Sequence, residues 1–441
     1  MPRVLPMLTP SMRYALRGGF LLRPFAIALT LGVMGAVLSS WEQHDPAIDS
    51  VVPEMLFPTR GDPQVAQAIL SDIATSVMTV VSIVFAILLM TLTLASTQFS
   101  PRILISFVRD QVTQWTLGVF LGTFTYCIAA LPAAHSLPRP FVPVLTVDVA
   151  MLLAPVCVGL LIYFIHHISN AISVNTIIDR IRRETELVID ELMPDHCNSS
   201  QRIDTTETLS GKPVYPIASR QSGYVRFIDI QRLTSLAKAY RISLRVERRV
   251  GYFVPEGVTL VRVSHGDRIT EECQTEILSA IDIGPVRTMQ QDIEFGIVQI
   301  VDIALKAMSP AVNDPTTAIS CVDQLSCILI RWLSRTPSST HYYNPPNVLR
   351  VVVPRAHFKG LLDLAFEQIR HYAVADAAVS LRLMRAFCDI SSTVTDPKTR
   401  HDLIDRGRHL IEAGNGHIQS GDRERLRKRL ALLESGATEE D

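Results

Sequence analysis

The sequence predicts an α-helical membrane protein in which four transmembrane helices are followed by a cytosolic α+β domain, built of a small β-rich module and a helical bundle. Residues 1–170 contain three apolar runs of membrane-spanning length and a shorter fourth. The remainder combines short β-type runs with charged amphipathic helices. At 441 residues and 48% hydrophobic, the chain is too apolar for an ordinary soluble enzyme and too polar to lie wholly in lipid.

The four spans are expected at about residues 20–41, 73–98, 113–134 and 144–168. Lipid offers no partner for backbone polar groups, so a long apolar run must satisfy them internally as a helix. The first run follows several arginines and could instead be a secretory signal. A retained span is favoured because Val37-Leu38-Ser39-Ser40 makes a poor cleavage site. Residues 1–170 therefore form the predicted transmembrane domain.

Basic residues near the span ends set the orientation, because cytoplasmic loops are enriched in lysine and arginine. The loop of residues 42–72 carries six acids against Arg60 alone, and is expected outside. Arginines flank the other ends, at Arg3, Arg13, Arg17, Arg23, Arg102, Arg109, Arg180, Arg182 and Arg183. The pattern predicts a multi-pass protein of the bacterial inner (plasma) membrane with both termini cytoplasmic.

The spans contain two patterns of small or hydroxylated residues. In the second span, hydroxylated residues recur as a stripe along one helix face at three- and four-residue steps and include Thr75, Thr79, Ser82, Thr93 and Thr97. In the third span, Gly118 and Gly122 form a G-x-x-x-G motif. The stripe could line a pore, although tight helix packing explains it as well and is favoured. No Asp, Glu, Lys or Arg lies deep in a span, which counts against active transport.

A sharp exit turn is expected where the second span meets the inner face, because proline cannot continue the helix. Its residues are Gln98, Ser100, Pro101 and Arg102. A gate, a contact with lipid headgroups and a plain helix exit anchored by arginine all remain open.

The rest of the chain divides into a helical extension of the fourth span (171–192), a linker rich in Ser, Thr, Asp and Pro (193–216), a small β-rich module (217–290), a mainly helical domain (291–435) and an acidic tail (436–441). Strands are expected at 224–230, 242–250, 258–263 and 348–353, and a short helix at 231–240. Longer helices are expected at 271–281, 291–308, 315–333, 358–372 and 376–390, followed by two polar helices that reach residue 433.

One constellation in the helical domain could hold a ligand. Four polar residues share a helix face and are followed by a second polar group around Asp314-Pro315, which has the form of a helix N-cap; the set is Asp292, Gln299, Asp302, Lys306, Asn313, Asp314, Thr316 and Thr317. Exposed amides could bind an anion, and Asp302 with Asp314 a metal. Capping and a solvated face explain the same residues and are favoured.

The composition argues against several function classes. With 42 basic and 43 acidic residues the net charge is −1, so no nucleic-acid partner is expected. The seven cysteines form no C-x-x-C pair, which fits neither a zinc site nor a disulfide framework. There is no phosphate-binding glycine loop and no nucleophile elbow, so we expect no cofactor and do not favour an enzyme.

Three motifs carry a resemblance to a family. Residues 94–102 (LASTQFSPR), Asp292-x-x-Phe-Gly-x-x-Gln-x-x-Asp302 and the run SPAVNDPTTA at 309–318 resemble the predicted bacterial membrane proteins grouped as domain of unknown function 2254. The resemblance implies four spans and a cytosolic domain over most of the chain. It implies no activity and no site residues.

Two functional hypotheses follow. The first is an oligomer of this chain with a channel-like or passive-permeation role, gated by its cytosolic domain, because four helices alone cannot enclose a wide path. The alternative is a membrane-anchored sensor or scaffold whose cytosolic module binds a small ligand or protein. The expected partners are the lipid bilayer, further copies of the chain and a small ligand of unknown nature.

Overall fold

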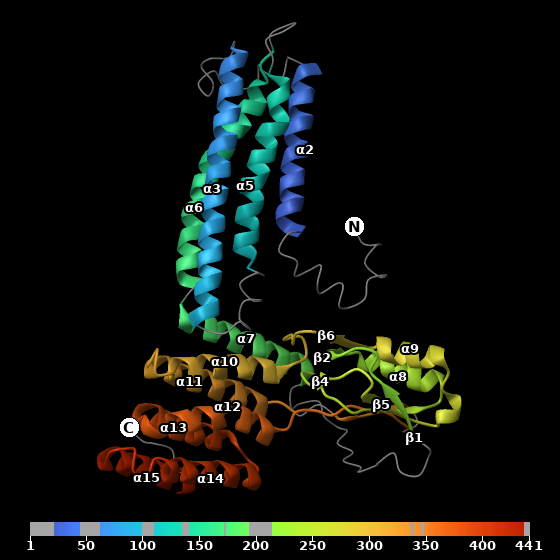
Figure 1. Cartoon of the computed structure of the whole chain (residues 1–441), viewed down its shortest axis with the longest axis vertical. Helices are drawn as coiled ribbons and strands as arrows, with labels where there is room; N and C mark the ends of the chain where they lie inside the picture. The colour runs from blue at the N-terminus through green and yellow to red at the C-terminus, as the bar shows by residue number, and fades with distance from the viewer. Residues whose placement is uncertain are drawn as a thin grey trace. The chain divides into compact units, whose positions relative to one another are not determined.

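The computed structural model describes residues 22–44, 62–98, 110–134, 141–171, 173–193, 214–336, 339–344 and 348–435. These residues belong to two compact units, one of residues 1–173 and one of residues 174–441. We call them the N-terminal unit and the C-terminal unit and describe each by itself (Figure 1).

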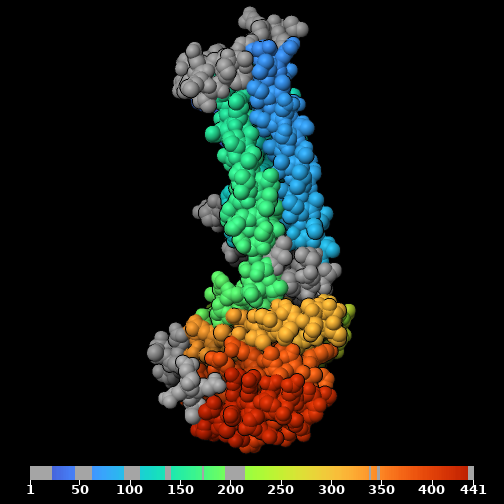
Figure 2. Space-filling view, turned by 90° about the vertical axis from the view of Figure 1, so that its left-hand side faces the viewer, coloured from blue at the N-terminus to red at the C-terminus, as the bar shows by residue number. Residues whose placement is uncertain are grey.

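The N-terminal unit is a bundle of four helices that are each long and apolar enough to cross a membrane. They are α2 (Leu22–His44), α3 (Pro63–Gln98), α5 (Gln111–Ala130, continued by the 3-10 turn η4, Leu131–Ala133) and α6 (Val144–Ala171). Helix α5 packs against the other three, and α3 also packs on α6, so that these two lie side by side (Figure 2). Leu117, Phe120 and Tyr126 of α5 fill the interior.

Helix α3 begins at Pro63, well before the predicted start at residue 73. Proline is favoured in the first turn, and the preceding Asp62 accepts a 2.9 Å hydrogen bond from the Gln64 amide. Ala66 and Leu70 are buried in the bundle. At 1.5 Å per residue, the 36 residues of α3 extend about 54 Å, more than the roughly 30 Å of a hydrocarbon core. The apolar run identified only part of the helix.

The two glycines of the G-x-x-x-G motif lie where α5 meets α2. A Cβ on Gly118 would lie 2.7 Å from Cδ1 of Ile27, and a Cβ on Gly122 would collide with Leu31. The absence of side chains at these positions lets the two helices approach closely.

The C-terminal unit begins with a helix of its own. Helix α6 ends at Ala171 and α7 starts at Val174, so the predicted uninterrupted extension of the fourth span is wrong. Helix α7 (Val174–Leu192) is amphipathic because one face belongs to the core of this unit, where it packs on α10 and α11. Its buried residues are Ile177, Ile178, Ile181, Thr185, Val188 and Ile189.

Two small sheets follow. One has five strands in the order β1-β5-β3-β8-β7, and the other has three in the order β4-β2-β6. The strands are β1 (Val214–Ala218), β2 (Gly223–Ile228), β3 (Ser243–Val246), β4 (Phe253–Val254), β5 (Thr259–Ser264), β6 (Ile281–Gly284), β7 (His341–Asn344) and β8 (Val348–Val352). Only the β3–β8 pair is parallel among the pairs described. Helices α8 (Ile230–Ala239) and α9 (Glu271–Ser279) and the turn η6 (Gly266–Arg268) connect the strands.

Three features of the β-rich part differ from the prediction. Strand β1 uses residues 214–216, which were assigned to the linker. Strand β6 includes Ile281, which was expected to end the preceding helix. Strands β7 and β8 come from the predicted helical domain, yet β8 pairs with β3, so the β-rich part is not confined to residues 217–290. Strand pairing joins residues far apart in sequence, and local patterns do not record it.

The helical layer contains α10 (Ile293–Ala307), α11 (Pro315–Leu333), α12 (Phe358–Tyr372), the turn η7 (Ala373–Ala375), α13 (Ala377–Thr393), α14 (Pro397–Ala413) and α15 (Ser420–Ser435). Helix α10 packs on α11 and α12, and α13 packs on α11, α14 and α15. The ends of α11 and α12 coincide with those expected from the sequence. Figure 2 shows the gold, orange and red helices of this layer stacked on one another.

Candidate functional site

The first residue of the predicted ligand set lies at the start of α10. Asp292 is the N-cap and accepts a 3.0 Å hydrogen bond from the Phe295 amide. Both its oxygens also pair with Arg287, at 2.8 Å from Nε and 2.8 Å from Nη2. Asp292 is only 3% exposed, so the predicted solvated face is wrong at this position. A buried charge needs such a partner, since desolvation without one is costly.

Two glycines make this arrangement possible. A Cβ on Gly296 would overlap Oγ1 of Thr185, so glycine allows α10 to lie directly on α7. Gly251 has a φ of +89°, and a Cβ there would lie 2.5 Å from Oδ2 of Asp292. The Asp-x-x-Phe-Gly motif is therefore explained by packing and by a buried ion pair.

A second ion pair, which the sequence analysis missed, lies beside the first. Arg249 contacts Glu294 at 2.6 Å and also donates to the Tyr252 hydroxyl at 2.7 Å. Burial raises the pKa of Glu294, Arg249 lowers it, and Asp292 raises it further. The two ion pairs together place two positive and two negative side chains at the start of α10.

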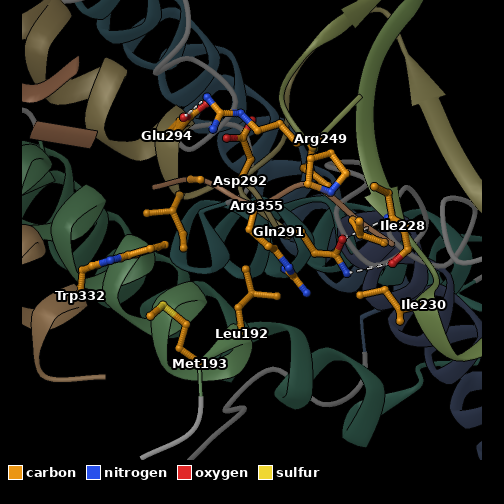
Figure 3. Close-up of a pocket in the computed structure, with 15 residues that line it drawn as sticks. Leu192, Met193, Ile228, Ile230, Arg249, Gln291, Asp292, Glu294, Trp332 and Arg355 are labelled. Carbon is orange, nitrogen blue, oxygen red and sulfur yellow. Dashed lines mark hydrogen bonds and ion pairs between the residues drawn. The ribbon is translucent and has the colours of Figure 1, made fainter. Parts of the chain in front are cut away.

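Arg249, Asp292 and Glu294 form one wall of a cavity of about 70 Å³ (Figure 3). The lining comes from the end of α7, the β2–α8 junction, the segment before β4, the start of α10, α11 and the segment after β8: Leu192, Met193, Ile228, Ile230, Arg249, Val250, Gln291, Asp292, Ile293, Glu294, Trp332, Val353, Pro354, Arg355 and Ala356. Gln291 bridges to β2, where its Oε1 accepts from the Ile228 amide at 3.0 Å. No sequence spacing links these segments, so the cavity was not predictable from motifs.

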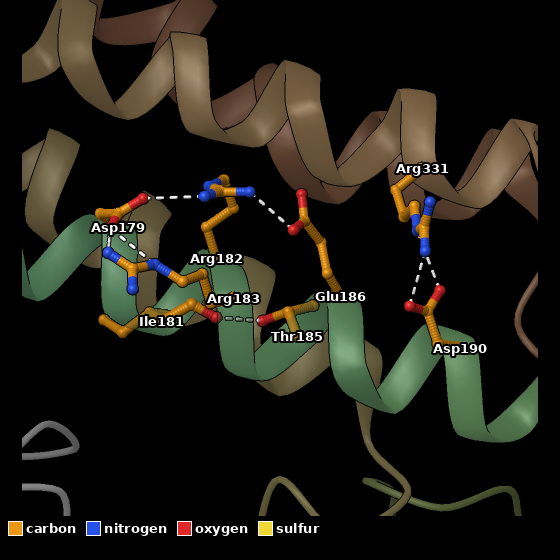
Figure 4. A network of polar contacts seen from close by, with 8 residues as sticks. All are labelled: Asp179, Ile181, Arg182, Arg183, Thr185, Glu186, Asp190 and Arg331. Carbon is orange, nitrogen blue, oxygen red and sulfur yellow. Dashed lines mark hydrogen bonds and ion pairs between the residues drawn. The ribbon is translucent and has the colours of Figure 1, made fainter.

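Helix α7, which reaches the cavity wall at Leu192, is held in the C-terminal unit by ion pairs (Figure 4). Asp190 contacts Arg331 and Arg335 at 2.7 Å each, and the hydrogen bond from Arg331 lowers the pKa of Asp190. Arg182 bridges Asp179 and Glu186 along the helix surface. The end of α7 is thus fixed against α11 next to the cavity.

The second half of the predicted set forms the turn between α10 and α11. Asp314 caps α11, accepting from the Thr317 amide at 3.1 Å and from the Thr317 hydroxyl at 2.6 Å. These bonds lower the pKa of Asp314. Asn313 adopts a φ of +50°, which reverses the chain, and Thr316 follows in the first turn of α11. This group has the structure of a helix cap.

The structure does not bring the eight predicted ligand residues together. Helix α10 has 15 residues and is therefore about 22 Å long, and Asp292 lies at its start whereas Lys306 lies near its end. Gln299 is buried between them and Asp302 is partly buried. Among the residues that the structure describes, no cluster of three or more His, Cys, Asp or Glu could hold a metal ion.

The hydroxylated stripe of α3 is exposed in the single chain. Thr75, Thr79, Ser82 and Thr93 all have exposed side chains. Each hydroxyl with a described partner donates to a carbonyl of its own helix, at 2.9 Å for Thr79, 3.0 Å for Ser82 and 2.8 Å for Thr93.

A shallow hollow runs along this stripe, lined by Ser71, Ala74, Thr75, Met78, Thr79, Ser82, Phe124 and Ile128. The side chains of Thr97 and Gln98 are not described, and Ser100, Pro101 and Arg102 lie outside the described residues, so the exit turn stays a prediction.

Comparison with known proteins identifies relatives along most of the chain. A family model described as "Predicted membrane protein (DUF2254)" matches residues 17–389. An uncharacterised protein of Mycobacterium bovis and one of Mycobacterium tuberculosis are each 31% identical over 391 residues, which is 86% of this chain and 73% of the relative. No solved structure matches the chain.

Proposed function

Because the chain belongs to the DUF2254 family of predicted membrane proteins, we propose that it forms an oligomeric, channel-like pathway for passive permeation, gated by its C-terminal unit. The proposed location is the bacterial inner membrane, with both termini in the cytoplasm. The arginines that follow the fourth span support this orientation.

The exposed stripe of α3 is the observation that carries the proposal. Thr75, Thr79 and Ser82 present hydroxyl groups on the outer surface of a helix that is otherwise suited to lipid. The bundle interior is filled by side chains such as Phe120 and Tyr126, so a path would run between copies of the chain. Copies arranged with α3 around one axis would line that path with hydroxyl groups.

The chain connection supports gating. Helix α7 begins three residues after the end of α6 and is anchored in the C-terminal unit through Asp190 and Arg331. A movement of the C-terminal unit would therefore reach the fourth span through a short connection. The same connection would carry a signal in either direction.

Flux through reconstituted vesicles tests this function. We expect the wild-type chain to release a trapped small solute, and the double variant Thr79→Val, Ser82→Ala to release it several-fold more slowly, because the hydroxyls along the path are lost. Thr30→Val on α2 is the matched control, since Thr30 is an exposed threonine that also bonds to its own helix. Absence of wild-type flux, or an equal effect of both variants, would contradict the proposal.

A second candidate function, a membrane-anchored sensor, is favoured by the cavity at the start of α10. This function needs ligand binding by the C-terminal unit and requires no pore. A chain that gives no flux but binds a small molecule in the cavity would support the sensor over the channel.

A further inference from the structure

We propose that the cavity at the start of α10 binds a short-chain monocarboxylate, with the carboxylate paired to Arg355. The proposal names a ligand for the binding site that the sensor function needs, and it does not depend on whether the spans conduct. It follows from the balance of charges, the size of the cavity and the nature of its walls.

The charges around the cavity leave one cation without an acidic partner. Asp292 is paired with Arg287, and Glu294 with Arg249. Within the described residues, the one polar contact of Arg355 is the hydrogen bond that it donates to the Tyr342 hydroxyl at 2.8 Å. A guanidinium in this position favours a carboxylate, whose two oxygens match its donor geometry.

The space and the walls restrict the ligand further. A cavity of about 70 Å³ has room for several waters or for a carboxylate with a short carbon chain. Leu192, Met193 and Trp332 make one side apolar. Asp292 and Glu294 disfavour a ligand with more than one negative charge. A single charge with a short apolar tail satisfies all of these conditions.

The position of the cavity gives such a ligand a means of control. It would lie between the end of α7, the start of α10 and the segment after β8, and would contact all three at once (Figure 3). Helix α7 follows the fourth span in the chain, so binding would change how firmly that helix is held in the C-terminal unit.

Fluorescence of Trp332 in the full-length chain tests the proposal. Replacing Trp41 and Trp115 with phenylalanine leaves Trp332 as the single tryptophan of the three in the sequence. Titration with butyrate should then give a saturable change with a dissociation constant on the order of 1 mM. Inorganic phosphate at about pH 8, where it is mainly a dianion, and butanol, which carries no charge, should each bind at least tenfold more weakly than butyrate.

Two variants assign the site. Arg355→Gln should weaken butyrate binding at least tenfold, because a charge-assisted pair is lost. Arg262→Gln, on β5 and half-exposed outside the cavity, should leave it unchanged. If Arg355→Gln does not fold, Ala356→Leu fills the cavity while keeping the charge and should give the same loss.

The proposal is overturned by several results: no saturable response of the wild-type chain, equal binding of phosphate or butanol, or undiminished binding by folded Arg355→Gln or Ala356→Leu. Flux in vesicles is scored separately. A chain that conducts but binds no butyrate refutes the proposed ligand and leaves the channel function intact. A chain that binds butyrate but does not conduct refutes the channel function and leaves the proposed ligand intact.

Discussion

Replacing Asp292 with alanine is expected to lower the free energy of unfolding of the C-terminal unit by about 3–5 kcal/mol. The change leaves Arg287 without its buried partner and removes the acceptor for the Phe295 amide. The measurement is urea unfolding of the full-length chain, followed by Trp332 fluorescence in the variant that lacks Trp41 and Trp115.

Asp396 provides the matched control, because it also caps a helix, α14, but is exposed and accepts from the Lys398 and Thr399 amides. Asp396→Ala should lower the free energy of unfolding much less than Asp292→Ala does. The double variant Arg287→Met, Asp292→Ala should recover part of the loss, since it leaves no unpaired charge. Equal losses for the two alanine variants would refute the account of the α10 motif.

Replacing Glu42 with alanine is expected to destabilise the N-terminal unit by about 2–5 kcal/mol. The carboxylate of Glu42, at the end of α2, is fully buried and accepts from the amides of Leu145 and Thr146 at 2.6 and 3.0 Å. It also contacts the Thr146 hydroxyl. These amides begin α6 and would lose their acceptor in an environment without water. Unfolding in SDS, followed by Trp41 and Trp115 fluorescence, measures the loss.

Asp62→Ala is the control for this prediction. Asp62 precedes α3 and accepts from the Gln64 amide, but it is exposed, so water replaces the lost bond. Glu42→Gln should have an intermediate effect, because the amide keeps one acceptor oxygen. If Asp62→Ala destabilises the N-terminal unit as much as Glu42→Ala does, burial of the Glu42 carboxylate adds no stability beyond that of an exposed helix cap, and the prediction is contradicted.

The sequence was most informative where a physical constraint acts locally. The length of the apolar runs identified the four helices that are able to cross a membrane. In lipid, a single segment can pair its backbone polar groups only by forming a helix. Asp314 and Pro315 predicted the start of α11, because an N-cap and a first-turn proline act within a few residues.

Long-range contacts were the main source of error. Glu42 was assigned to the acidic loop of residues 42–72 because it follows the apolar run of the first span, yet its partners lie at the start of α6. Asp292 was placed on a solvated face because its partner Arg287 precedes the helix and contributes nothing to helical periodicity. The Arg249–Glu294 pair and Arg355 likewise depend on tertiary contacts, so neither the second ion pair nor the cavity could be predicted.

Particle images of the full-length chain in lipid discs test the central proposal, a path between copies lined by α3. We expect a closed ring of copies with Thr79 and Ser82 facing its axis. Isolated single chains, or a ring in which these two residues face lipid, would contradict it.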